Sequence, residues 1–501
     1  MFSNIKEMKK LLILMGFLFM LISCSEDFLE EPPSKNNSLQ IKSVEQLAGI
    51  LNNNVFTENI FADAINVYCT DNTEIPTQLF DAAQGEGFSP EDFDQYTWQT
   101  TIENVSEAVY LHHYFIIAQM NVILENIDRS DVEGDDMERR EVRAEAYLRR
   151  AWSYLQLASV YTLPYSEANL EEMGLVLRQT TSPTESQIRS NLKDTYDFIE
   201  ADILEALKHP VLEHREGGRW RYTKPAADAL ASRFYLITGD YEKAEEHASA
   251  ALSAHSTMLD YQNEIFELGA FNFGDGFDVV YPSSFFHFNS TDYNSFHRDY
   301  FFSQANTNFR INTPPSQELI SLIQPGDIRS FFFVENGHMW VSNRYADFPY
   351  FTYVRQPFVR MQGLSVPECY LTRAECRARL GDIGGAMEDL EVVRINRFRS
   401  DMYNPLPIPA TPKIAVEEII DERRREFPYS LRWIDIRRLN TDPLTDPITI
   451  TREFYEVSNG SVSSNSAPRT YTLEPNDRRY ARPLAPNTIF KSQGQTEQNT
   501  Y

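Results

Sequence analysis

The stretch that decides the fold runs from Ile419 to Leu439 and reads IIDERRREFPYSLRWIDIRRL. Apolar residues recur along it at the spacing of one helix face, and Arg423 falls within that face. A buried arginine without an anionic partner costs several kcal/mol, so we expect Arg423 to meet a carboxylate on this stretch or elsewhere in the chain. Pro428 disfavours the helical conformation at Phe427 and should end the first helix there. A second short helix should then run to Leu439.

The three consecutive arginines, Arg423–Arg425, allow two interpretations. They are either a structural clamp that pairs with carboxylates or a patch that binds phosphate or nucleic acid. The formal net charge of -27 over 501 residues disfavours polyanions as partners. We therefore favour the clamp and expect no nucleic-acid partner. A chain of this length can bury a large core.

The beginning of the chain has the features of a lipoprotein signal peptide. Lys6, Lys9 and Lys10 precede the apolar run Leu11–Ile22, which is too short to span a bilayer at about 20 residues. The run leads into Leu-Ile-Ser-Cys, ending at Cys24, which resembles a bacterial lipobox. We expect cleavage before Cys24 and lipidation of its thiol. The alternative is a plain secretory signal with an incidental cysteine.

An acidic, proline-containing segment follows the cysteine. Residues 25–34 read SEDFLEEPPS, a composition that cannot bury itself. Ser43 and Gln46 then have the spacing of a capping box for a helix through Leu51. We therefore predict a signal peptide at 1–23, a lipidated acidic tether at 24–42 and a single domain over 43–501.

Helical periodicity dominates the next part of the chain. Apolar residues recur every three or four positions over Ile102–Ile127 and over Glu138–Tyr161, as on one face of a helix. Ser186–Leu207 has the pattern of a further amphipathic helix. Trp152 and Trp433 lie within periodic segments, so both are expected in the core. Residues 52–100 show few helix signals and are expected to be irregular, although a long irregular stretch inside a compact domain is either functional or a mis-assignment.

Two later segments repeat one pattern of helix, Gly-Asp and second helix. Ala231–Leu252 reads ASRFYLITGDYEKAEEHASAAL, and Ala374–Val393 reads AECRARLGDIGGAMEDLEVV. In each, glycine permits a tight turn, and an alanine five residues later lets the paired helices approach closely. These positions are Gly239 with Ala244 and Gly381 with Ala386. The pattern is tetratricopeptide-like, but the copies lie too far apart for a tandem array of about 34-residue repeats.

These patterns predict a mainly α fold. It would be a tetratricopeptide-like helical-repeat scaffold, over about 102–256 and 367–440, with long irregular loops and a few short β-hairpins. Residues 257–366 would form a loop-rich ligand-binding part. Within it, Phe331–Asn343 is expected to form a hairpin, because Asn336-Gly337 suits a type I′ turn.

Aromatic residues outside the long helices are candidates for ligand contact. In many proteins the binding residues lie on loops that a rigid scaffold carries. Trp98 and Trp340 both lie outside the long helical segments and are the leading candidates here. Rings stack on the apolar face of a sugar while tyrosine hydroxyls hydrogen-bond its rim. The alternative is that such residues form turns or fill a small core. The candidate ligand-binding residues are Asp71, Tyr96, Trp98, Tyr293, Trp340, Tyr345 and Tyr350.

Motifs of catalysis, metal binding and redox chemistry are absent from the sequence. There is no HExxH, GxSxG, P-loop or glycine-rich dinucleotide turn, and His112-His113 has no companion at zinc-ligand spacing. Cys369 and Cys376 lie about 10.5 Å apart along one predicted helix, too far for a disulfide. With Cys69 they are expected to be buried thiols. We expect no catalytic residue, cofactor or metal.

Two segments of the opening stretch, Glu422–Phe427 (ERRREF) and Arg432–Arg438 (RWIDIRR), together resemble the C-terminal signature of the SusD/RagB family. The segment behind Cys24, the helical segment Ala144–Trp152 and the closing segment Arg479–Ile489 resemble that family as well. Its members are surface lipoproteins that capture nutrients for an outer-membrane transporter. The resemblance implies a SusD-like fold, in which tetratricopeptide-like helix pairs are interrupted by long loops.

For function, the resemblance implies a non-catalytic lipoprotein on the surface of the outer membrane. It would bind an oligosaccharide and deliver it to a SusC-like TonB-dependent transporter for nutrient uptake. The RagB branch of the family implies oligopeptides instead. Two other classes stay open: a secreted glycoside hydrolase, which needs two carboxylates about 5–10 Å apart across a cleft, and a helical-repeat adaptor without a small ligand.

The lipobox generates a first prediction. Changing Cys24→Ala should release the protein from the membrane fraction, because the acyl chains that anchor it would have no thiol to attach to. Fractionation of cells followed by immunoblotting measures the effect. A variant that stays membrane-bound, without accumulation of the uncleaved form, would show that Cys24 is not the anchor.

Overall fold

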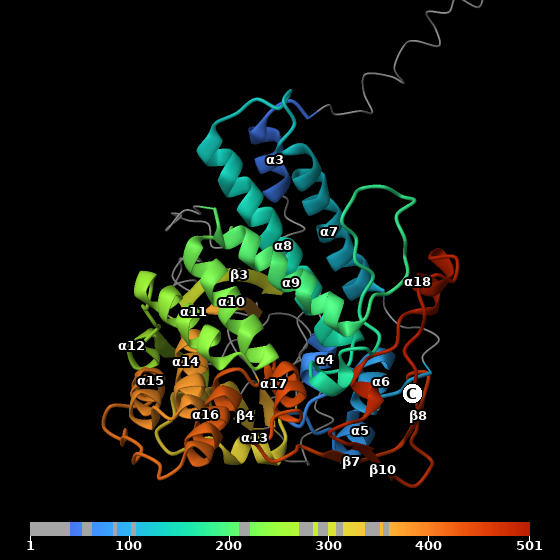
Figure 1. Ribbon diagram of the computed structural model, residues 1–501. Helices are drawn as coiled ribbons and strands as arrows, with labels where there is room; N and C mark the ends of the chain where they lie inside the picture. The colour runs from blue at the N-terminus through green and yellow to red at the C-terminus, as the bar shows by residue number, and fades with distance from the viewer. Residues whose placement is uncertain are drawn as a thin grey trace, which may run out of the picture.

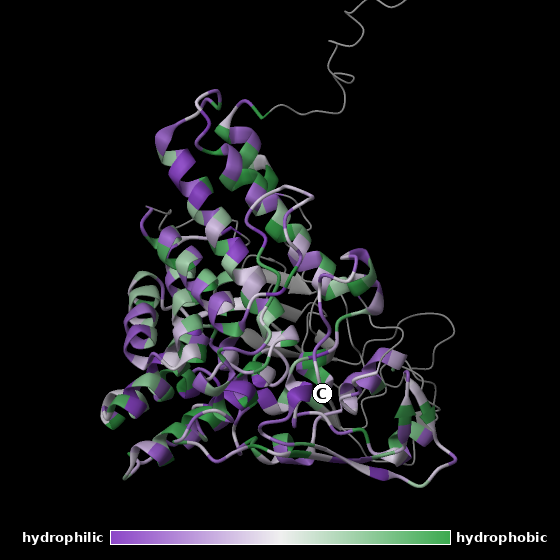
Figure 2. Cartoon of the chain, turned by 45° about the vertical axis from the view of Figure 1, so that its right-hand side comes forward, coloured by the Kyte–Doolittle hydropathy of each residue, from purple (hydrophilic) through white to green (hydrophobic). Residues whose placement is uncertain are grey.

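Helices make up most of the computed structural model, which describes residues 41–52, 63–83, 88–101, 107–209, 221–269, 284–288, 299–306, 314–335, 351–353 and 360–501 (Figure 1). Figure 2 shows hydrophobic and hydrophilic residues alternating along the helices, as expected of helices with one face in a core. Among the described residues, no helix is both long enough and apolar enough to cross a membrane.

Three helices form the end of the molecule at the top of Figure 1. They are α3 (Val44–Leu51), α7 (Ala108–Asn126) and α8 (Asp136–Tyr161), which enclose a small core of their own. The capping box is confirmed: the Ser43 side chain accepts a hydrogen bond from the backbone amide of Gln46, whose side chain bonds the Ser43 amide. The two long helices confirm the predicted periodic segments, although residues 102–106 lie outside the described chain.

The next helix, α9, spans Leu192–Leu207 and begins six residues later than the sequence pattern indicated. The Asn191 side chain caps it by accepting a hydrogen bond from the Asp194 amide at 2.7 Å. Before the cap, Ser190 exchanges backbone hydrogen bonds with Gly174 and Leu175 at 2.7 and 2.8 Å. These contacts hold residues before Asn191 extended, so the predicted start at Ser186 is wrong.

Two helical hairpins confirm the repeated Gly-Asp pattern. The first pairs α10 (Lys224–Thr238) with α11 (Tyr241–Ala254), and the second pairs α14 (Val366–Leu380) with α15 (Ile383–Ile395). Gly239 and Gly381 end the first helix of each pair with φ values of 82° and 95°, in the left-handed region that favours glycine. The two hairpins pack together through α11 and α14, and α16 (Pro412–Glu426) covers α14.

Residues 63–100 contain more helix than the sequence signals indicated. Three short helices lie there, namely α4 (Asp63–Tyr68), α5 (Thr77–Ala83) and α6 (Pro90–Tyr96). Ser89 and Asp92 form a capping box for α6, with Pro90 in its first turn. The expectation of an irregular segment is therefore wrong for this region, because local caps and packing stabilise helices too short to show periodicity.

The strands of the described chain form small two-stranded antiparallel sheets. β4 (Phe333–Glu335) pairs with β5 (Phe351–Tyr353). The expected turn at Asn336-Gly337 lies outside the described residues. The other pairs are β1 (Ile265–Gly269) with β2 (Ser284–Phe288), β3 (Tyr300–Asn306) with β6 (Arg360–Ser365), β7 (Ile450–Phe454) with β10 (Arg469–Leu473), and β8 (Glu456–Ser458) with β9 (Ser461–Ser463).

The remaining elements are short. They are α12 (Tyr261–Glu264), α13 (Gln317–Ser321), α17 (Arg432–Leu439) and α18 (Pro486–Lys491), with 3-10 turns η2 (Glu167–Asn169), η4 (Ile328–Phe332) and η5 (Arg478–Tyr480). As predicted, α16 ends before Phe427 and α17 runs to Leu439.

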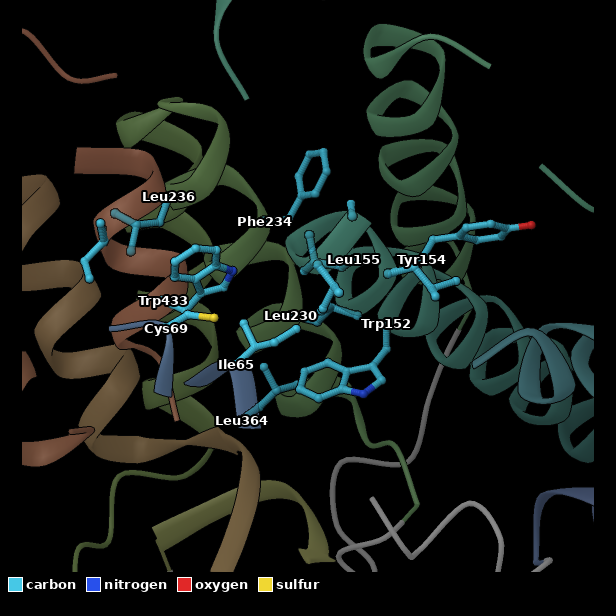
Figure 3. Close-up of a cluster of buried hydrophobic side chains, with 14 of the residues drawn as sticks. Ile65, Cys69, Trp152, Tyr154, Leu155, Leu230, Phe234, Leu236, Leu364 and Trp433 are labelled. Carbon is cyan, nitrogen blue, oxygen red and sulfur yellow. The ribbon is translucent and has the colours of Figure 1, made fainter. Parts of the chain in front are cut away.

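The main core lies between α8, α10 and α17 (Figure 3). Trp152 and Trp433 are only 3% and 1% exposed, which confirms both as core residues. The Trp433 indole donates a hydrogen bond to the Ser159 carbonyl at 3.0 Å. Cys69, Cys369 and Cys376 are buried free thiols, which confirms the expectation for all three.

Arginines and carboxylates form a buried network around α16 and α17. Arg423 contacts Asp435 at 3.2 Å, so it meets a carboxylate as predicted. Glu422 contacts Arg329 at 2.7 Å, Arg425 at 2.8 Å and Arg394 at 3.3 Å. Burial alone would raise the pKa of Glu422, but these arginines hold it well below its ordinary value. The triplet is thus a structural clamp.

The network generates a second prediction. Because the folded-state pKa of Glu422 lies below the unfolded value, its contribution to stability is full above about pH 4.5 and is lost as the pH falls further. Glu422→Gln should lower the free energy of unfolding at neutral pH by about 3–5 kcal/mol, since three arginines lose a buried partner. It should also flatten the loss of stability below about pH 4.5.

Urea denaturation over a pH series measures both effects. Asp446→Asn is the matched control, because Asp446 pairs with Lys413 at 2.8 Å while its side chain is 82% exposed. That change should cost less than about 1 kcal/mol and leave the acid profile unaltered. An acid profile of Glu422→Gln identical to that of the wild type would contradict the assignment.

Candidate functional site

A pocket of about 410 Å³ lies where four segments of the chain meet. Four segments form its walls: residues 71–76, the end of α6 at Tyr96, the start of α13, and residues 449–453, which lie in β7 or directly before it. A β-bridge between Thr73 and Pro315 and a hydrogen bond of 2.9 Å from the Ser316 amide to the Asn72 carbonyl join two of these segments. In Figure 1, α13 and β7 lie at the end of the molecule opposite α3. The pocket therefore brings together Asp71 and Tyr96, two of the predicted site residues.

Asp71 lies in the pocket wall as a member of the arginine network. Arg432 donates two hydrogen bonds to its carboxylate at 2.8 and 2.5 Å, and Arg424 approaches at 3.3 Å. Burial opposes ionisation of Asp71, but the two arginines prevail and lower its pKa to about 2. Its side chain is 11% exposed. Asp71 thus ties the segment 71–76 to α16 and α17, and ligand contact by its remaining surface stays a prediction.

Tyr96 and Trp98 lie in the interior, each only 1% exposed. The Tyr96 hydroxyl accepts a hydrogen bond from the Ile75 amide at 2.8 Å, and the Trp98 indole donates one to the Cys69 carbonyl at 3.1 Å. The expectation that Trp98 presents its ring on a loop surface is therefore wrong. Its backbone has a φ of 51°, which turns the chain at the end of α6 and directs the ring inward.

Arg452 explains why both rings are buried. Its guanidinium carbon lies 4.1 Å from the centre of the Tyr96 ring and 4.4 Å from that of Trp98. The guanidinium donates hydrogen bonds to the carbonyls of Tyr68, Thr70 and Tyr96. Burial lowers its pKa. The two rings and three carbonyls take the place of a carboxylate partner.

Arg452 was missed by the analysis of the sequence, although a signal was present. β7 reads ITREF, with Ile450, Arg452 and Phe454 on its buried face. A charged residue on the apolar side of a strand predicts a buried charge that needs a partner, as Arg423 does on the apolar face of a helix. That pattern could have identified Arg452 as a buried cation, but not the aromatic residues that surround it.

Polar groups in the pocket offer hydrogen bonds to a ligand. The Thr73 hydroxyl is buried and, within the described chain, has no hydrogen-bond partner. A buried polar atom of this kind requires water or a ligand group. Glu74, Thr449 and Glu453 stand at the exposed rim. The described residues contain no group of three metal-ligating side chains. This arrangement suits a ligand that carries hydroxyl groups.

The other predicted site residues cannot be placed. Tyr293, Trp340, Tyr345 and Tyr350 lie outside the described residues, as does Cys24. Ligand contact by these four aromatic residues and lipidation of Cys24 stay predictions.

Comparison with protein families decides where the chain belongs. A SusD-like family model, described as "Starch-binding associating with outer membrane", matches residues 27–236, and a model of the SusD family matches residues 366–501. The chain belongs to the SusD family. The second match contains the arginine-rich stretch of α16 and α17, and the first contains the segment 71–76 that Arg424 and Arg432 hold.

Solved structures confirm the SusD-like fold. A SusD-like carbohydrate binding protein from Bacteroides vulgatus is 16% identical, with a TM-score of 0.64 over 90% of this chain and 97% of that chain. A SusD superfamily protein from Bacteroides thetaiotaomicron is 18% identical, with a TM-score of 0.65 over 92% and 100%. One from Bacteroides fragilis is 18% identical, with a TM-score of 0.60 over 91% and 99%. A search of curated proteins found no match.

The burial of Trp98 generates a third prediction. Trp98→Ala should lower the free energy of unfolding by about 3–5 kcal/mol, because it leaves a cavity and uncovers one face of the buried Arg452 guanidinium. Phe490→Ala, at a ring that is 81% exposed, is the control and should change stability by less than about 0.5 kcal/mol. Urea denaturation measures both. Wild-type stability of Trp98→Ala would contradict the core role.

Proposed function

We propose that this SusD-family protein binds an oligosaccharide at the cell surface without cleaving it and delivers it to a SusC-like TonB-dependent transporter. The family assignment carries the proposal, since one matching model is described as starch-binding and associated with the outer membrane. A structural relative that shares the fold is a carbohydrate binding protein. The pocket beside Asp71, with its unpartnered Thr73 hydroxyl, supplies hydrogen-bonding groups for such a ligand.

Attachment through Cys24 would suit this role. The tether predicted over 24–42 joins the described chain just before α3, and α3 lies at the opposite end of the molecule from α13 and β7, which border the pocket (Figure 1). An anchor at that end would leave the pocket unobstructed by the tether. The protein would then be held on the outer membrane by lipid while its pocket faced ligand or transporter.

The electrostatics of Asp71, in the wall of the pocket, favour binding over hydrolysis. A glycosidase requires a general acid whose pKa is raised, whereas two arginines lower the pKa of Asp71 to about 2. Glu318 is likewise held by Arg424 at 2.6 Å. Asp71 is thus unsuited to act as a general acid. For Glu74, Glu318 and Glu453, which also line the pocket, the proposal rests on the family assignment. We therefore propose that the protein is not an enzyme.

Binding generates the fourth prediction. The mature protein in mild detergent should bind at least one member of a panel of neutral glucan, mannan, xylan and fructan oligosaccharides and leave it intact. Thr73→Val should weaken that binding up to about tenfold, because one hydrogen bond to a buried hydroxyl is lost. Thr184→Val, at an exposed position that lines neither this pocket nor a neighbouring one, is the control and should bind as the wild type does. Calorimetry measures the binding affinity, and chromatography of the sugars shows whether they stay intact.

Three results would contradict the proposal in different ways. Binding of oligopeptides alone would favour the RagB-type alternative, and release of reducing ends would favour the glycoside hydrolase. Purification from the native outer membrane in mild detergent should bring a large β-barrel transporter with the protein. Recovery of the lipoprotein alone would argue against delivery.

A further inference from the structure

A second, larger pocket of about 750 Å³ lies on the helical-repeat scaffold. It is bordered by the turn between α10 and α11, the end of α14, the end of α17, residues 165–168 and residues 441–444. It shares no lining residue with the pocket beside Asp71. Its volume is within the range of small-molecule sites, about 300–1,000 Å³. None of the residues predicted to bind ligand lies in it.

The floor of this pocket consists of paired charges. Arg379 contacts Asp442 and lies 2.7 Å from Glu375, and Arg438 donates two hydrogen bonds to Glu375 at 2.6 and 2.8 Å. Arg438 also contacts Asp435 at 2.9 Å. Each lining arginine thus has carboxylate partners within the protein, so a charged ligand would displace an existing ion pair rather than complete one. The floor therefore favours an uncharged ligand that can hydrogen-bond.

A smaller cavity adjoins this floor and shares Tyr165, Ile237 and Arg438 with it. Arg437 lines that cavity, and its guanidinium donates hydrogen bonds to three backbone carbonyls, at 2.7 to 3.3 Å. The carbonyls belong to Tyr480, Ala158 and Thr162. The cavity of about 20 Å³ holds no more than a water molecule, so a ligand in the larger pocket does not reach Arg437.

The walls combine aromatic rings with hydroxyl groups. Tyr165 and Tyr241 are half-buried. The Tyr165 ring packs on that of Tyr196, with ring centres 4.6 Å apart. The Arg379 guanidinium lies 4.7 Å from the centre of the Tyr241 ring. These contacts hold both rings in place. Hydroxyls of Ser166, Thr238 and Thr441 stand beside them. Fixed aromatic surface next to polar groups is the combination that sugars require.

We propose that this second pocket is an additional binding site for a neutral oligosaccharide. The inference rests on the proposed function and adds a site on the face formed by the helical hairpins. Its lining segments are helix ends and loops, which present no strand edge to a peptide backbone. Two weak sites on one chain would retain a polysaccharide longer than either alone, because binding at one raises the local concentration at the other.

Blocking the pocket tests this inference. Ala168 is exposed and lines the pocket, so Ala168→Trp should fill it without disturbing the core. Ala410→Trp places the same ring at an exposed position outside both pockets and is the control. Calorimetric titration of the mature protein with the neutral oligosaccharides should show that Ala168→Trp loses one site or weakens binding at least tenfold. Ala410→Trp should titrate like the wild type.

The outcomes separate this inference from the proposed function. If the wild type binds a neutral oligosaccharide and Ala168→Trp titrates identically, the second site is refuted and the proposed function stands. If the wild type binds none of the panel, both are refuted. Oligogalacturonate and oligopeptides are titrated alongside the neutral panel, and a loss of binding confined to either of them would also refute a neutral-sugar site. If Ala168→Trp has a lower melting temperature than the wild type, Glu167→Trp, at the neighbouring exposed position that also lines the pocket, is titrated in its place. The same outcomes then apply to that variant.

Discussion

Pairing of buried arginines with buried carboxylates is the constraint on which the rest of this structure depends. Glu422 joins α16 to η4 and α15 through Arg329 and Arg394, and Asp435 joins α16 to α17 through Arg423. Each of these charges lies where burial alone would make it unfavourable. Removing one member leaves its partners buried and uncompensated, so the network allows the helices only one arrangement.

The same network extends to the candidate site. Asp71 is held by arginines of α16 and α17, and Arg452 is enclosed by the Tyr96 and Trp98 rings. The wall of the pocket is therefore built from residues whose side chains are already fixed by strong contacts. Because these side chains are already ordered, binding a ligand there would not require the wall to lose further conformational entropy.

The two pockets lie toward opposite ends of α17. Arg432, in its first turn, bonds Asp71 of the first pocket, while Arg438, in its last turn, lines the second. One short helix, anchored by Asp435 to α16, thus supports both. A scaffold of packed helical hairpins keeps this helix in position, whereas the walls of the two pockets are formed by the ends of elements and the loops that connect them.

The sequence by itself determined the features that neighbouring residues decide. The capping box at Ser43, the left-handed turns at Gly239 and Gly381, and the end of α16 at Glu426, two residues before Pro428, follow from local backbone chemistry. The sequence also showed that Arg423 needed a compensating partner, because an unpaired charge within an apolar face is unfavourable. For Arg423 that partner is a carboxylate, whereas for Arg452 it is two aromatic rings and three carbonyls.

Only the tertiary structure decided which groups meet. Asp71 and Arg432 lie 361 positions apart, and Trp98 is buried because Arg452, from a distant strand, inserts beside it. A local pattern states what a side chain requires but not which distant residue supplies it, since that choice depends on the packing of all elements together. For that reason the long periodic helices could be predicted, while the short helices of residues 63–100 and the walls of the pockets could not.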